Sequence, residues 1–180
     1  TVSGFIETNR LVTRVSPDKE GVLIDYMDGK SGQVAGYRAK KCILAVPQFI
    51  AARLLVDKDR QQLVKEKVQY CPWMVANRKV EKLEERSGAP LSWDNVLHGS
   101  QSLGYVEASH QLLQQDKAQR NLTYYLPLTQ EPPAEARKKA QAKTHAQWVK
   151  EIMDELRVVH PNIDEAVKEM NVILWGHAMV

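Results

Sequence analysis

The apolar pattern of this 180-residue chain changes its period near Pro47, and that change limits the possible folds more than any other feature of the sequence. Before it, apolar and polar residues alternate between turn signals, as in residues 11–26, which is the pattern of half-buried strands. After it, apolar residues recur at three- and four-residue steps over residues 48–69, which is the spacing of a helix. We therefore expect two structural units, residues 1–47 and residues 48–180.

The first unit is expected to be a small β-meander. Two alternating segments, residues 11–15 and 21–26, flank a Ser-Pro-Asp turn at residues 16–18, and residues 34–38 form a short edge strand. Residues 41–47 are different, because five consecutive apolar residues end there at a proline. A continuous apolar run of this kind predicts a strand that is buried on both faces, as in a parallel sheet.

The second unit mixes helical and strand-like segments. We expect helices at residues 48–69, 133–159 and 163–167 and strands at residues 74–83, 102–110, 121–128 and 169–177. The fold class is therefore α+β (α/β), with a mixed, largely antiparallel sheet, a long backing helix at residues 133–159, and the small meander of the first unit.

Composition places the chain among ordinary globular proteins. Apolar residues make up 43% and charged residues 26%, so disulfide-framework, collagen-like and disordered chains are excluded. No apolar run approaches the roughly 20 residues that a transmembrane helix needs. The net charge is +3, and acidic residues surround the densest basic run at residues 137–139, so we expect no nucleic-acid partner. We expect a cytoplasmic location, with the periplasm as the alternative.

Three kinds of chemical site find little support in the sequence. The five histidines are scattered and no HExxH or CxxC motif occurs, so we expect no metal site. The nine glycines form no GxGxxG motif, so the chain has no phosphate cradle of its own. A serine hydrolase built on Ser102, His110 and Asp94 lacks the GxSxG elbow and ranks below the other hypotheses.

Aromatic residues gather on or beside the expected strands of the second unit, namely Trp73, Trp93, Tyr105, Tyr124, Tyr125 and Trp175. One interpretation is a half-buried sheet with amphipathic aromatic side chains. The other is a set of rings that lines one face of an apolar ligand cavity. Alternation along a strand puts Tyr124 and Tyr125 on opposite faces, so only one of the two can line such a cavity.

Several sequence blocks resemble the flavin-containing amine oxidase superfamily. A glycine turn at Gly29 precedes residues 37–40 and then the apolar segment 42–47, which ends in Ala-Val-Pro like the Ala-x-Pro strand of that superfamily. Four further blocks look like a bacterial subgroup of FAD-dependent or NAD(P)-binding oxidoreductases, at residues 70–77, 91–96, 103–108 and 175–179. The resemblance covers nearly the whole chain.

The resemblance implies an internal fragment of a longer FAD-dependent oxidoreductase. The first unit then corresponds to strands from the central part of the FAD-binding domain, and the second unit to the substrate-binding domain. Val12 matches a strand position whose backbone meets the adenine, and Ala45, Val46 and Pro47 match a strand end that passes near the flavin. The implied cofactor is FAD in the parent protein. The implied partners are a small-molecule substrate and the rest of the parent chain.

The resemblance also implies that the parent passes a hydride equivalent from an organic substrate, such as an amine, to the flavin. The expected substrate contacts are Trp73, Asn77, Tyr105, Tyr124 and Trp175. Many members of the superfamily carry a lysine near the place of Asn77, so this departure leaves the substrate class open. No catalytic residue is assigned, and the chain alone is expected to be inactive. The alternative function is a non-catalytic α+β module that binds a protein or peptide.

Overall fold

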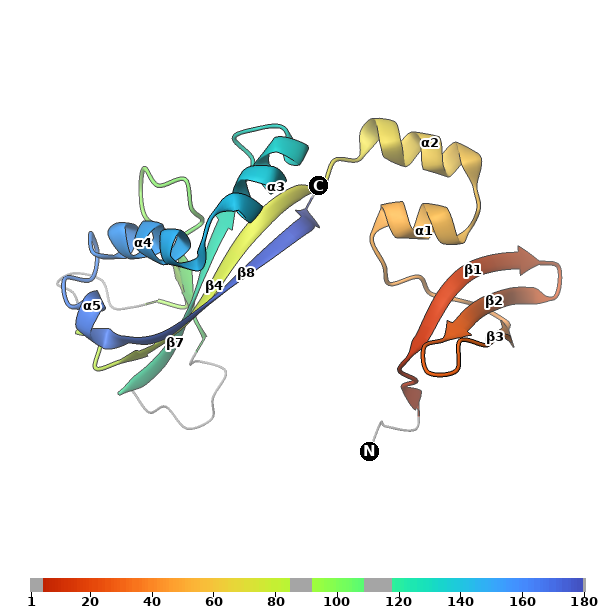
Figure 1. The fold of residues 1–180 in the computed structure, drawn as a ribbon, viewed down its shortest axis with the longest axis horizontal. Coiled ribbons are helices and arrows are strands. Elements are labelled where there is room, and N and C mark those ends of the chain that lie inside the picture. Colours follow the sequence, from red (N-terminus) through yellow and green to blue (C-terminus); the bar gives the residue numbers. More distant parts are fainter. Residues whose placement is uncertain (1–4, 85–91, 109–117, 180) are drawn as a thin grey trace. The chain divides into compact units, whose positions relative to one another are not determined.

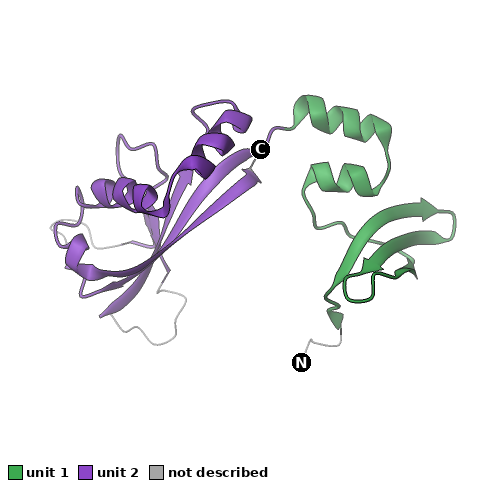
Figure 2. Ribbon diagram, in the orientation of Figure 1, with its two compact units in different colours: residues 1–68 green, residues 69–180 purple. Residues whose placement is uncertain are grey.

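The computed structural model describes most of the chain, namely residues 5–84, 92–108 and 118–179. The chain divides into two compact units, residues 1–68 and residues 69–180, which Figure 2 colours separately. The boundary expected from the sequence lies earlier, at Pro47. In the structure the two helices that follow this proline belong to the first unit, because the first of them contacts the first strand and the second contacts its partner helix.

The first unit consists of a three-stranded sheet and two short helices. The strands β1 (Arg10–Asp18), β2 (Gly21–Asp28) and β3 (Val34–Ala39) form an antiparallel meander in the order β1-β2-β3 (Figure 1). The helices α1 (Gln48–Leu54) and α2 (Lys58–Lys67) follow. The meander that the alternating pattern predicts is therefore present.

The strand expected at residues 41–47 is absent, so that prediction is wrong. The segment has no regular structure and most of its side chains are exposed, with Ile43 at 91%. A strand buried on both faces needs a neighbouring strand to pair with. In the described part of the chain, no strand pairs with this segment, and β1 and β3 are the outer strands of the three-stranded sheet. An apolar run predicts burial, but it does not provide the pairing partner.

The second unit is built on a five-stranded antiparallel sheet with the strand order β5-β6-β7-β4-β8. Its strands are β4 (Cys71–Glu81), β5 (Asp94–Asn95), β6 (Tyr105–Glu107), β7 (Gln119–Pro127) and β8 (Val167–Met179). Two antiparallel sheets together with helices confirm the α+β class. The strand β4 lies between β7 and β8 and pairs with both along most of its length.

Between β7 and β8 the chain forms the helices α3 (Pro133–Ala142), α4 (His145–Leu156) and α5 (Ile163–Ala166). Figure 1 shows α3 and α4 over the same face of the sheet. The long helix expected at residues 133–159 is therefore two helices. The break occurs because Thr144 starts a new helix: its hydroxyl accepts from the backbone N–H of Gln147, and the Gln147 side chain accepts from the backbone N–H of Thr144.

The core of the second unit lies between the sheet and α4. It includes Met74, Ala76 and Val80 of β4 and Trp148, Ile152 and Leu156 of α4. Every second residue of β4 is buried, as the period of a strand requires when helices cover one face only. The alternate residues of β4 point to the face that the helices leave uncovered. Among the described residues, no helix is long and apolar enough to cross a membrane.

Candidate functional site

The uncovered face of the five-stranded sheet collects most of the residues that the sequence singled out. Residues that are register partners on neighbouring strands point to the same face of a sheet. The open face, as we call it, comprises Trp73, Val75, Asn77 and Lys79 of β4, Thr123 and Tyr125 of β7, and Asn171, Ile173 and Trp175 of β8. These side chains form successive rows across the adjacent strands β7, β4 and β8.

The rows near the start of β4 are aromatic and apolar. Trp73 is the register partner of Trp175, and Val75 lies between Tyr125 and Ile173. Trp175 is 56% exposed and Ile173 is 40% exposed. Contiguous exposed apolar side chains on a sheet indicate a surface that another molecule covers. Indole rings in particular offer a flat, apolar contact area with one polar N–H.

The next row is made of neutral amides and a hydroxyl. Asn77 lies between Thr123 on β7 and Asn171 on β8. The Thr123 hydroxyl donates to Asn77 Oδ1 at 2.8 Å, and Asn171 Nδ2 donates to Glu169 Oε1 at 2.9 Å. Charged side chains begin only one row further, where the register partners Lys79 and Glu169 stand opposite each other. The open face therefore grades from aromatic through amide to charged.

Three of the five expected substrate contacts share this face, namely Trp73, Asn77 and Trp175. Tyr105 and Tyr124 lie on the opposite face, register partners of each other and 0% and 2% exposed. The tyrosine on the open face is Tyr125, which was not among the expected substrate contacts. Alternation along β7 shows that only one of Tyr124 and Tyr125 can lie on the open face. Which of the two it is becomes known only when the face covered by the helices is known.

A buried cation lies on the helix-covered face of β4. The Arg78 guanidinium is 5.9 Å from the ring centroid of Tyr105 and 5.5 Å from that of Tyr124, a cation–π arrangement. Arg78 is fully buried, and none of its guanidinium nitrogens has a hydrogen-bond partner among the described residues. Burial lowers the pKa of Arg78 to about 10, although the nearby Tyr124, Tyr105 and Glu155 act in the opposite direction. The side chain stays charged at neutral pH.

A carboxylate on α4 completes this buried cluster. Glu155 accepts hydrogen bonds from the Tyr124 hydroxyl at 2.7 Å and from the Ser102 hydroxyl. Burial, followed by the hydrogen bond to Glu155, raises the pKa of Tyr124. On the other side, the Tyr105 hydroxyl lies 2.6 Å from Nε2 of His160. The arrangement links β6, β7 and α4 and so stabilises the packing of the helix layer on the sheet.

The alternative serine hydrolase site is not assembled in the described part of the chain. The Ser102 hydroxyl donates to the carboxylate of Glu155 rather than to a histidine. Asp94 is exposed and is the register partner of Val106 on β6. His110 lies outside the described residues. A nucleophilic serine needs a base at hydrogen-bond distance, and Ser102 has a carboxylate there instead.

The residues expected to contact FAD lie in the first unit. Val12 is half-buried next to a β-bulge, because Val12 pairs with Tyr26 while Arg14 already pairs with Asp25. Bulges occur often beside binding sites, where they redirect a strand. Ala45, Val46 and Pro47 are exposed in the irregular segment before α1.

The phosphates of FAD, in contrast, find no cradle in the described residues. A dinucleotide site needs a glycine-rich turn that leads into a helix. The first helix, α1, starts after Pro47, whose side chain makes no capping hydrogen bond, and no glycine precedes it closely. The described residues therefore do not form an FAD site by themselves.

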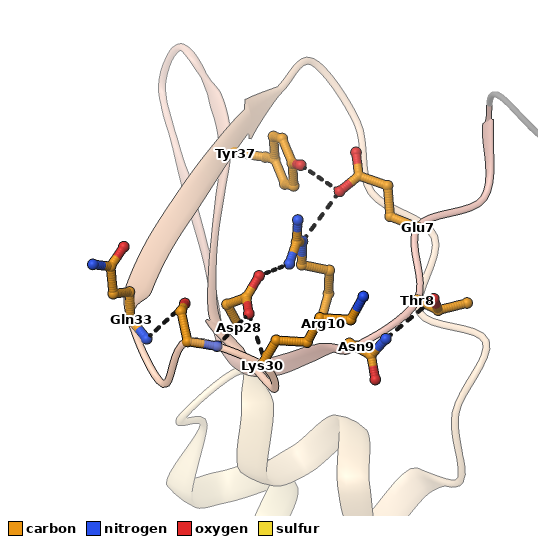
Figure 3. Close-up of polar contacts among 9 residues, drawn as sticks. Glu7, Thr8, Asn9, Arg10, Asp28, Lys30, Gln33 and Tyr37 are labelled. Atoms are coloured by element: carbon orange, nitrogen blue, oxygen red, sulfur yellow. Dashed lines mark hydrogen bonds and ion pairs between the residues drawn. The ribbon is translucent and has the colours of Figure 1, made fainter.

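A polar network that the sequence did not indicate ties the segment before β1 to β3 (Figure 3). Glu7 Oε2 accepts from the Tyr37 hydroxyl at 2.7 Å and from Arg10 Nε at 3.2 Å, and Arg10 also forms an ion pair with Asp28. The rings of Tyr26 and Tyr37 stack with centroids 5.1 Å apart. Hydrogen bonds from Tyr37 and Arg10 lower the pKa of Glu7, and the same bond to Glu7 raises the pKa of Tyr37 to about 12.

One cavity of roughly 250 Å³ lies between α3, α4 and the end of β7. Leu126, Leu128 and Trp148 are among its apolar lining residues, and the Lys143 ammonium lies 4.2 Å from the centroid of the Trp148 ring. Lys143 also forms an ion pair with Glu151 at 2.7 Å. The charges at this cavity therefore have partners within the protein, and the cavity is on the helix side of the sheet, away from the open face.

Comparison of the chain with known protein families and with curated proteins gave no match. Within residues 5–84, 92–108 and 118–179, no three histidine, cysteine, aspartate or glutamate side chains come together as a metal site. The arrangement of aromatic and amide side chains in adjoining rows makes the open face the candidate functional site.

Proposed function

We propose that this chain contains the substrate-binding unit and part of the nucleotide-binding unit of an FAD-dependent oxidoreductase that resembles the flavin-containing amine oxidases. The observation that carries the proposal is the open face. Helices cover one side of the five-stranded sheet, while the other side presents Trp73, Trp175 and Tyr125 in adjoining rows. Such a face suits one wall of a cavity that holds an organic substrate against a flat cofactor.

In this proposal the second unit binds and orients the substrate, and FAD in the complete protein accepts the hydride equivalent. The aromatic rows exclude water from the apolar part of the substrate, and the amide row at Asn77 provides directional hydrogen bonds. In this role the chain itself supplies shape and orientation.

The surface of the first unit supports a role as part of a larger domain. Its exposed apolar side chains include Phe5 and Ile43, each 91% exposed, and Val34 at 74%. A small unit with this much exposed apolar surface is normally covered by another part of a protein. In the proposal, the rest of the flavin domain covers it and provides the phosphate cradle. This further chain is therefore the expected partner of the first unit.

We include a cytoplasmic location in the proposal, with the periplasm as the alternative. Cys42 and Cys71 are both free thiols, as is usual in reducing compartments. A non-catalytic module that binds a protein or peptide is the second candidate function, and the exposed apolar side chains of the first unit favour it equally. The two candidates differ in one property, which is the presence of a flavin.

The test is to isolate the polypeptide that carries this sequence from the cells that produce it, using antibodies against the chain. After denaturation, the released flavin is measured by fluorescence. The proposal expects FAD in a stoichiometric amount. A matched isolation, in which excess purified chain blocks the antibodies, gives the background. A polypeptide that releases no more flavin than this background contradicts the oxidoreductase and leaves the binding module.

A further inference from the structure

We propose that the open face selects a neutral ligand with an amide edge, such as a lactam, and an apolar planar body. Asn77 and Asn171 bind the amide edge, and the aromatic rows beside Trp73 and Trp175 bind the body. This inference rests on the proposed function, because it names the substrate class of the same face.

The first step is the orientation of the Asn77 side chain. A carboxamide has one oxygen that accepts and one nitrogen that donates. The oxygen of Asn77 is engaged, since the Thr123 hydroxyl donates to it at 2.8 Å. The Nδ2 group has no assigned partner among the described residues, so Asn77 presents a hydrogen-bond donor on the open face.

The second step is the opposite orientation of Asn171. One N–H of its Nδ2 group donates to Glu169 Oε1 at 2.9 Å, and Oδ1 accepts from no group among the described residues, so Oδ1 is available as an acceptor. Asn77 and Asn171 are register partners on β4 and β8, so their side chains start about 5 Å apart on the same face. One strand therefore presents a donor and the next an acceptor, side by side.

The donor of Asn77 and the acceptor of Asn171 together complement a ligand group that carries an acceptor beside a donor. The C=O and N–H on one edge of a lactam have this arrangement, whereas an ammonium group has donors only. A cationic ligand would also gain from a carboxylate in these rows whose oxygens have no other partner. The nearest one, Glu169, already accepts from Asn171 and faces Lys79 in the ladder. The amide row thus favours a neutral ligand.

The spacing of the rows sets the size of the apolar body. Two residues along a strand span about 7 Å, which is the distance from the Asn77 row to the Val75 row. A bicyclic ring system that starts at the amide row covers Val75, Ile173 and Tyr125. The indoles of Trp73 and Trp175, one row further, lie at its far end. Because these side chains are aromatic or branched, they favour a planar body.

The test uses 2-quinolone, a planar bicyclic lactam, added to the purified chain. Proton–nitrogen correlation NMR follows the side-chain amide of Asn77 and the indole N–H groups of Trp73 and Trp175. N-methyl-2-quinolone keeps the carbonyl but lacks the N–H, and tryptamine carries an ammonium group on an aromatic body. We expect 2-quinolone to bind about tenfold more tightly than the N-methyl compound, which is the size of one well-formed hydrogen bond.

Two variants locate this selectivity. Asn171→Leu removes the acceptor, so it is expected to bind 2-quinolone and its N-methyl form equally. Asn77→Leu removes the donor to the carbonyl and is expected to weaken both by a similar factor. Gln141→Leu, at an exposed amide of α3, is the matched control and leaves both affinities unchanged. The ligand comparison on the unaltered chain needs no variant to fold.

Equal binding of the two quinolones by the unaltered chain overturns the inference, because stacking alone then explains the affinity. Tighter binding of tryptamine, or no binding of 2-quinolone, overturns it as well. The flavin measurement is independent of these results. If the protein contains no flavin but prefers 2-quinolone, the oxidoreductase proposal fails and the amide selectivity stands. If the protein contains flavin but shows no such preference, the amide selectivity fails and the oxidoreductase proposal stands.

Discussion

The guanidinium of Arg78 lies 5.5 Å from the ring centroid of Tyr124, and both side chains are almost completely shielded from water. The ring and the charge attract each other, but the guanidinium makes no hydrogen bond within the described residues. Burying a charge without hydrogen bonds costs several kcal/mol, which the two cation–π contacts, with Tyr124 and Tyr105 and of at most about 2 kcal/mol each, offset only in part. Arg78 therefore contributes volume to the core more than it contributes attraction.

The first prediction follows from this imbalance. Arg78→Met keeps most of the volume and removes the buried charge, so the free energy of unfolding should stay the same or rise by up to about 2 kcal/mol. Arg78→Ala leaves a cavity and should lower it by about 3 kcal/mol. Urea unfolding followed by tryptophan fluorescence measures both. If methionine destabilises the protein as much as alanine does, the charge itself is stabilising and the interpretation fails.

The second prediction concerns the turn that leads into β6. Gly104 has a φ of +77°, and a Cβ atom there would overlap the backbone carbonyl of Asn95. Gly104→Ala should therefore prevent β5 from pairing with β6 and lower the free energy of unfolding by more than about 3 kcal/mol. Gly99 has a similar φ of +81° but open space around it, so Gly99→Ala should cost only about 1 kcal/mol.

Comparison of the two glycine variants separates the overlap from the backbone strain. Both are measured by urea unfolding under the same conditions. Equal losses for Gly104→Ala and Gly99→Ala would show that the contact with Asn95 is relieved by a small backbone shift.

The third prediction concerns strain between α1 and α2. Val56 has a φ of 54°, a left-handed conformation that is unfavourable for a β-branched residue, and it is 60% exposed. Val56→Gly should raise the free energy of unfolding by about 0.5 kcal/mol, because relief of about 1–2 kcal/mol exceeds the entropy cost of glycine. Val158 is 80% exposed and has no positive φ, so Val158→Gly should be destabilising. Thermal unfolding by circular dichroism measures both changes.

The fourth prediction is a pH dependence of the first unit. Hydrogen bonds from Tyr37 and Arg10 lower the pKa of Glu7 in the folded state, so the charged carboxylate is stabilising above the pKa of the unfolded chain. That stabilisation is lost as the pH falls through the lowered pKa. Wild type should therefore exceed Glu7→Gln in thermal midpoint at about pH 7, and the difference should shrink as the pH falls below the ordinary glutamate pKa and vanish below the lowered pKa of the folded state.

Glu20 provides the control for this pH series, because its side chain is 83% exposed and its nearest cation, in Arg38, is 3.8 Å away. Glu20→Gln should follow wild type at every pH. A Glu7→Gln variant whose deficit is constant with pH would mean that packing, and not charge, is responsible.

Much of the fold follows from local sequence patterns. The alternation in β1, β2, β4 and β7 predicted strands at nearly the observed places, and the helical spacing after Pro47 predicted α1 and α2. The helix expected at residues 133–159 is two helices, because the hydrogen bonds between Thr144 and Gln147 start a new helix. The Thr-x-x-Gln capping pattern is present in the sequence, but the apolar spacing on either side of it favours one continuous helix.

Alternation by itself determined that Tyr124 and Tyr125 point to opposite faces. Only the tertiary structure decided which face is open. The period of a strand is fixed by backbone geometry, whereas its phase depends on the surface that the helices cover. Here the packing of α4 on Met74, Ala76 and Leu122 buries Tyr124 and leaves Tyr125 on the open face, and this depends on contacts between residues far apart in the chain.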